Sequence, residues 1–118
     1  MITISRHQLD ALQAAKDRAF AEKALGVLTR LWSARLGARD PQVLLNWASD
    51  GVGRGRALGF VTEKDVCGLL NLSLVLTEFA PTFDWPDWAG AILARRERAP
   101  VERLAAVRAE WRRRIGQP

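Results

Sequence analysis

The glycine-rich run GVGRG at residues 51–55 is the first segment whose composition suggests chemistry, because loops of this kind bind phosphate through backbone N–H groups. A phosphate-binding loop also needs a strand before it, a helix after it, and a Lys-Ser/Thr pair or a further glycine at a fixed spacing. Here Gly53 is followed by Arg54, Gly55 and Arg56, and the flanking residues have a helical pattern. We therefore interpret the run as a frayed or interrupted helix end and expect no nucleotide or other cofactor.

Asp84 and Asp87, on either side of Trp85 and Pro86, are a second candidate for chemistry, because paired carboxylates can act as general acid and base. A working pair needs two environments that separate the pKa values and a cleft that holds the substrate, and the sequence indicates neither. Asp87 stands directly before Trp88, a position that predicts a helix cap instead. We predict no catalytic residue and expect the chain not to be an enzyme.

The single cysteine and the single histidine restrict redox and metal chemistry. One cysteine, Cys67, allows no intramolecular disulfide, and its place in an apolar segment favours a small buried side chain over a reactive thiol. With His7 as the only histidine, a zinc site would have to be assembled from scattered carboxylates. No metal site is expected.

The positive charge of the chain is concentrated at one end. Residues 1–94 contain ten Lys/Arg and ten Asp/Glu, whereas residues 95–118 contain eight arginines and three glutamates. Four of these arginines are candidates for partner contacts: Arg108, Arg112, Arg113 and Arg114. Such a cluster can neutralise phosphates of a nucleic acid or bind an acidic protein surface through bidentate contacts with carboxylates. Because Glu110 lies four residues before Arg114, same-helix ion pairs favour a solvated basic face over a nucleic-acid site.

Five tryptophans are more than a core of this size usually needs, and they fall into two groups. Trp32, Trp47 and Trp111 occupy helical positions that we expect to face the core. Trp85 and Trp88 lie with Phe83 in a loop interrupted by prolines. Two interpretations of the loop aromatics stay open: they close the core beneath the loop, or they anchor a partner protein as exposed hot-spot residues.

Helix-start signals recur along the chain. Ser5 and Gln8 form a capping box, Asp40 precedes a proline suited to the first helical position, and Thr62 has Asp65 three residues on. Apolar residues at steps of three and four extend from these starts. The pattern predicts helices over about 6–36, from 41 onward, over about 63–78, 88–95 and 100–115, with a possible bend near 17–22.

Three of these predicted helices have an expected buried face. The first carries Leu9, Leu12, Phe20, Ala24, Val27, Leu28 and Leu31; the second Val43, Leu44 and Trp47; the last Val101, Leu104, Trp111 and Ile115. The helix over about 63–78 is apolar on nearly every side, so its neighbours must surround it. No segment alternates as a strand does. We predict an all-α fold, a compact single domain over residues 1–118 with four to five helices around this central one.

The segment that contains the central helix is too short and too interrupted to span a bilayer, and the first residues lack the order of a secretion signal. We therefore expect a cytoplasmic protein of bacterial type.

The order of elements resembles a group of small bacterial proteins encoded beside type VI secretion spike and toxin genes. The matching segments are ISRHQLDAL, RGRALGFVTEKDVCGLLNLSLVL, TFDWPDWAGAIL and a terminal helix led by proline. The resemblance implies a non-enzymatic adaptor, chaperone or co-component that binds a secreted toxin or its loading partner. An immunity protein for such a toxin, or a small nucleic-acid-binding regulator that uses the basic helix, are the alternatives. The glycines of the run at 51–55 depart from the alanine- and charge-rich helix expected there.

Overall fold

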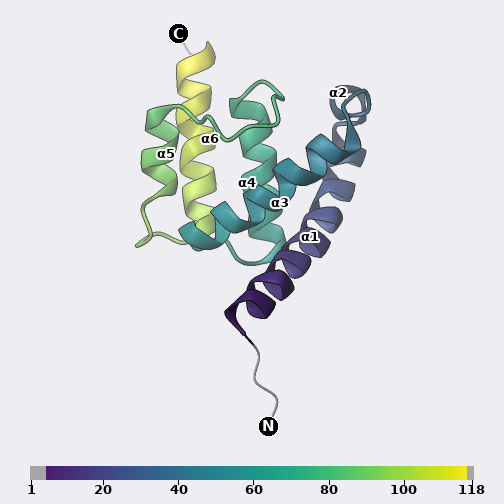
Figure 1. Cartoon of the computed structure of the whole chain (residues 1–118). Helices are drawn as coiled ribbons and strands as arrows, with labels where there is room; N and C mark the ends of the chain where they lie inside the picture. The colour runs from purple at the N-terminus through teal and green to yellow at the C-terminus, as the bar shows by residue number, and fades with distance from the viewer. Residues whose placement is uncertain (1–4, 117–118) are drawn as a thin grey trace.

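The computed structural model describes residues 5–116, and within them the chain forms six α-helices and no strand. These helices are α1 (Arg6–Leu31), α2 (Ser33–Leu36), α3 (Pro41–Leu58), α4 (Glu63–Leu76), α5 (Asp87–Leu93) and α6 (Pro100–Gly116). Figure 1 shows α4 between the α1–α3 pair on one side and α5 with α6 on the other. The all-α prediction is confirmed.

Local capping chemistry places three of the helix starts. The Ser5 side chain accepts from the Gln8 backbone in a reciprocal capping box, and Thr62 accepts from the backbone N–H of Asp65. Asp40 accepts from Gln42 ahead of a proline at the first helical position. These predictions are confirmed. The predicted cap at Asp87 is wrong, because Pro86 precedes α5 without a side-chain bond and Asp87 is the first residue of that helix.

The first predicted helix is divided at Trp32. α1 runs without interruption from Arg6 to Leu31, and Trp32 leaves helical geometry with φ −119° and ψ 38°. This turn lets the Trp32 indole reach α4, where its Nε1 donates to Asn71 Oδ1 at 2.6 Å. α2 follows as a separate short helix.

Two of the three glycines of α3 serve close packing, and the prediction of a frayed or interrupted end is wrong. α3 continues to Leu58, and Gly51 and Gly55 are buried within it. A Cβ at Gly51 would meet the Leu70 side chain and lie 2.7 Å from Phe83 Cζ. The absence of a side chain at Gly51 therefore lets α4 and the α4–α5 loop approach the backbone of α3.

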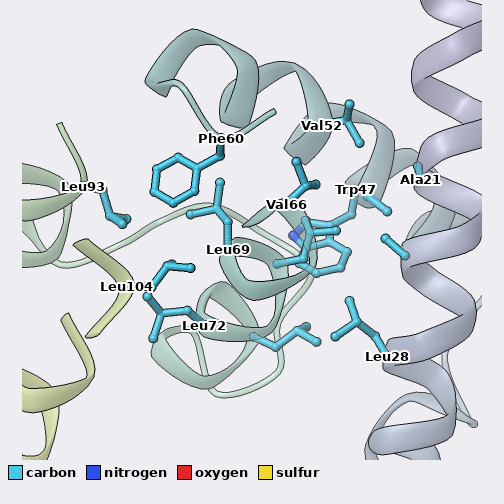
Figure 2. Packing of buried hydrophobic residues seen from close by; sticks show 14 of the residues in the cluster. Ala21, Leu28, Trp47, Val52, Phe60, Val66, Leu69, Leu72, Leu93 and Leu104 are labelled. Carbon is cyan, nitrogen blue, oxygen red and sulfur yellow. The ribbon is translucent and has the colours of Figure 1, made fainter. Parts of the chain in front are cut away.

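The buried residues form one hydrophobic cluster around α4. Val66, Leu69, Leu70 and Leu74 are almost wholly buried, as expected for the central helix. In Figure 2 the α4 side chains meet Ala21 and Leu28 of α1, Trp47 and Val52 of α3, and Leu93 and Leu104 of α5 and α6. The prediction of a central apolar helix enclosed by its neighbours is confirmed.

Several predicted core positions are at the surface. Leu9 and Leu12 are 53% and 54% exposed, because the first turns of α1 extend beyond the other helices (Figure 1). Val27, Leu31, Val43, Val101 and Ile115 are also exposed. The spacing identified an apolar face on each helix, but only part of each face is buried: Ala24 and Leu28 on α1, Leu44 and Trp47 on α3, and Leu104 on α6. Ala21 is also buried, although it was not among the predicted positions.

One charged residue is in the core. Arg103 on α6 is 2% exposed, and its Nη1 donates to the carbonyls of Leu58 and Leu93, both at 2.7 Å. A buried cation needs such acceptors because it has left the water that would otherwise solvate it. Arg103 thereby joins α6 to the end of α3 and the end of α5.

Candidate partner-binding surface

Phe83 and Trp85 of the α4–α5 loop are packed against the body of the protein. The Trp85 indole N–H donates to Ser73 Oγ of α4 at 2.8 Å, and Trp85 meets Phe83 edge-on with 6.0 Å between ring centroids. Phe83 stacks on Trp47 at 5.4 Å, and Trp47 donates to the carbonyl of Thr82 at 3.1 Å. Of the two interpretations left open above, this geometry favours loop closure for Phe83 and Trp85.

Trp88 at the start of α5 lies beside the C-terminal part of α6. The Arg114 guanidinium carbon stands 4.9 Å from the centroid of the Trp88 ring, a cation–π contact. Trp88 is half-buried against the hydrophobic cluster. The structure thus brings together one predicted aromatic and one predicted arginine.

Arg113 and Arg114 both pair with Glu110 on the same helix, whose one negative charge offsets one of their two positive charges. Both Arg113 and Arg114 donate to the Glu110 carboxylate, through Nε at 3.0 Å and 2.9 Å respectively. The hydrogen bond from Arg113, followed by that from Arg114 and the charges of both, lowers the pKa of Glu110 to about 2. The positive charge of these two arginines is therefore already partnered within α6.

Arg108 and Arg112 have a different environment. They line a hollow of about 130 Å³ between α4 and α6, which we call the α4–α6 hollow and which is formed by Asn71, Leu72, Val75, Arg108, Trp111 and Arg112. Within residues 5–116 no carboxylate forms an ion pair with Arg108 or Arg112. The hollow thus combines an apolar floor with two unpaired guanidinium groups.

The apolar part of the hollow comes from both helices. Leu72 is buried beneath it, and Val75 and Trp111 are half-buried along its walls. Ile115, one helical turn beyond Trp111, is 60% exposed and prolongs the apolar surface along α6. Trp111 was predicted as a core residue, and the structure places it at the edge of the core instead.

The Asn71 side chain completes the polar rim. Its Oδ1 accepts from the Trp32 indole, and because an indole N–H can only donate, the amide NH₂ is the end that makes no contact with Trp32. The sequence alone does not predict this role of Asn71. A polar residue inside an otherwise apolar helix was the available signal, but its partner Trp32 lies 39 residues away in the sequence.

A second hollow, of about 200 Å³, lies between α1, α3 and the start of α4. Asp17 and Arg56 on its rim pair with each other. This hollow offers fewer unpartnered charged groups than the α4–α6 hollow, although apolar residues such as Phe60 and Val66 also line it.

The described residues offer little support for metal binding, thiol chemistry or a membrane span. Residues 5–116 contain no cluster of three or more His, Cys, Asp or Glu side chains arranged to hold a metal ion. Burial, and secondarily the charge of Glu63, raises the pKa of the Cys67 thiol, which disfavours its nucleophilic thiolate form. None of the helices in this range has the length and apolarity to cross a bilayer.

Comparison with known proteins identifies no relative. No protein-family model, no curated protein and no solved structure matches this chain.

Proposed function

We propose that this protein is a non-enzymatic protein-binding module that holds a larger partner through the α4–α6 hollow. The supporting observation is the coincidence of an apolar floor with Arg108 and Arg112, whose charges have no carboxylate partner among residues 5–116. Interface hot spots combine buried aromatic or aliphatic anchors with arginine in this way. A volume of about 130 Å³ is also well below the roughly 300 Å³ at which small-molecule sites begin.

In this proposal each group has a separate part. Trp111 and Val75 receive an apolar side chain of the partner, and Arg108 and Arg112 form the charged rim. The periphery of the interface is formed by Arg113, Arg114 and Trp88. Their side chains are already engaged, since Arg113 and Arg114 pair with Glu110 and Arg114 also contacts the Trp88 ring. Phe83 and Trp85 support the surface from beneath by fixing the loop to α4 and α3.

The partner class comes from the order of sequence elements. The capped opening helix, the apolar central helix and the segment TFDWPDWAGAIL resemble small proteins encoded beside type VI secretion spike and toxin genes. We infer an adaptor, chaperone or co-component that binds a secretion toxin or a spike-associated protein in the cytoplasm of the producing cell. An immunity protein for such a toxin would use the same kind of surface.

Nucleic-acid binding by α6 is the second candidate, and Arg108 and Arg112 favour it because they are exposed and unpaired in the described chain. Glu110 weakens it by pairing with Arg113 and Arg114 and offsetting one of their two charges. A phosphate-based site predicts binding to duplex DNA or RNA that falls at least about tenfold between low and physiological salt. Flat or absent binding at low salt would eliminate this candidate.

Affinity purification from the native bacterium with quantitative mass spectrometry tests the proposal. The bait is compared with Arg108→Glu/Arg112→Glu and with a matched control, Arg96→Glu/Arg98→Glu, which makes the same charge change at exposed positions outside the hollow. We expect a secretion toxin or spike-associated protein to be captured by the wild type and the control and lost by the first variant. Equal capture by all three baits would contradict the proposal.

A further inference from the structure

The rim of the α4–α6 hollow consists of hydrogen-bond donors. Arg108 and Arg112 offer guanidinium N–H groups and no acceptor. Asn71 has both kinds of group, and its Oδ1 already accepts from the Trp32 indole at 2.6 Å. Most of the polar groups on the rim are therefore N–H donors, which favours a ligand that supplies acceptors.

The Trp32 contact also fixes the orientation of the Asn71 amide. An asparagine side chain is nearly symmetric in shape, and only its partners decide which end is the carbonyl. Because the indole N–H must meet an acceptor, the reversed amide would place two donors against each other. The α1–α4 contact thus fixes the NH₂ as the end of the Asn71 amide that does not bind Trp32, on a residue that lines the hollow.

The two cations adjoin the apolar surface of the hollow. Arg108 and Arg112 are one helical turn apart on α6, about 5–6 Å between Cβ atoms, and Trp111 lines the hollow with them. A free inorganic anion could bind the guanidinium groups but would leave the apolar side chains of Leu72 and Val75 without a contact. A protein segment can satisfy the donors and the floor together.

From these contacts we propose that the α4–α6 hollow recognises an acidic–apolar segment of the partner, in which one aliphatic or aromatic side chain enters the hollow and the Asp or Glu side chains beside it bind Arg108, Arg112 and the Asn71 amide. This inference rests on the proposed protein-binding function and specifies the chemistry of its partner. Charge-assisted hydrogen bonds are about twice as strong as neutral ones, so the carboxylates determine which segments bind. The aliphatic or aromatic side chain supplies the apolar contact.

Peptide titrations followed by NMR of the ¹⁵N-labelled full chain test the proposal. The probe is a short peptide, blocked at both ends, with the sequence Glu-Leu-Glu in a glycine–serine background. Its controls replace both glutamates by glutamine, replace the leucine by serine, or place a leucine with a free carboxylate at the chain end and no acidic side chain. Inorganic phosphate is the final control.

We expect the Glu-Leu-Glu peptide to shift the Trp111 indole and Asn71 side-chain amide signals saturably, with each control peptide binding at least about tenfold more weakly. Equal binding of the glutamine peptide, of the peptide with the free terminus, or of phosphate would overturn the proposal. So would the absence of any saturable shift at these two residues.

Asn71→Asp provides a variant that separates recognition from folding. The aspartate keeps an oxygen for the Trp32 indole but replaces the amide donor with a negative charge. We expect at least about tenfold weaker binding of the acidic peptide with the Trp32 indole signal retained. Unchanged affinity would overturn the proposal. If the acidic peptide fails while Arg108→Glu/Arg112→Glu still loses the cellular partner, the protein-binding function stands and only this chemistry is wrong.

Discussion

Arg103 and Phe60 are stacked in the core, with the guanidinium carbon of Arg103 4.5 Å from the centroid of the Phe60 ring. Both residues are buried, and the same guanidinium donates to the carbonyls of Leu58 and Leu93. Next to Phe60, Gly59 ends α3 with φ 91°, a conformation that glycine adopts without strain. The corner between α3 and α4 is thus closed by a side chain from α6.

Replacing Arg103 by alanine should destabilise the fold by about 3 kcal/mol or more, because two buried carbonyls lose their donor and a cavity remains. Urea unfolding followed by circular dichroism measures the change. Arg108→Ala is the matched control on the same helix, and at its exposed position we expect a change within about 0.5 kcal/mol. Equal stability of the two variants would show that the Arg103 contacts contribute little.

Trp85 offers a graded test of loop closure. Trp85→Phe removes the hydrogen bond to Ser73 and should cost about 1 kcal/mol, whereas Trp85→Ala also removes packing and should cost about 3 kcal/mol. Thermal or urea unfolding distinguishes the two losses. An alanine variant with wild-type stability would instead favour Trp85 as a partner anchor.

Two glycines of α3 should respond oppositely to alanine. At Gly51 a Cβ would lie 2.7 Å from Phe83 Cζ and would also meet Leu70, so Gly51→Ala should destabilise the protein by about 1–3 kcal/mol. At Gly53 nothing lies within 4 Å of the added carbon, so Gly53→Ala should stabilise by up to about 1 kcal/mol through helix propensity. The free energies of unfolding of the two variants, each compared with that of the wild type, test these opposite predictions. A stabilising Gly51→Ala would contradict the packing described for this site.

The lowered pKa of Glu110 predicts a pH-dependent stabilisation. Since the folded-state pKa is about 2 against an ordinary value of 4.5, the contribution is complete above pH 4.5 and disappears as the pH falls toward 2. The Tm difference between the wild type and Glu110→Gln should shrink across this window and should also decrease with added salt, because the carboxylate is exposed. A difference independent of pH would argue against the Arg113 and Arg114 pairs.

The helix starts were predictable because their causes are local. Ser5, Asp40 and Thr62 cap helices through backbone groups two or three residues away. The helix that carries Leu69 and Leu70 is apolar on nearly every side, and this pattern alone predicted that other helices enclose it. What covers each helix face depends on distant segments. Leu9 therefore looked like a core residue on α1 although it is 53% exposed. Nothing in the local spacing indicated that Arg103 is buried, because its acceptors, the carbonyls of Leu58 and Leu93, belong to other segments.

The candidate site likewise has a part that the sequence indicates and a part that depends on the packing of distant segments. Arg108 and Arg112 were identifiable from the excess of arginine in the tail, and Glu110 from its spacing to Arg114. The meeting of these cations with Asn71 and Val75 depends on the packing of α6 along α4, which local spacing does not specify. The orientation of the Asn71 amide depends further on Trp32 at the end of α1.

The most direct test of the partner-binding claim is the Kd of the purified protein for the protein that it captures in the cell, measured by isothermal titration calorimetry for the wild type and for Arg108→Glu/Arg112→Glu. We predict that reversing these two charges weakens binding at least about a hundredfold, while Arg96→Glu/Arg98→Glu stays close to the wild type. Indistinguishable Kd values for the hollow variant and the wild type would contradict the assignment of the α4–α6 hollow as the binding surface.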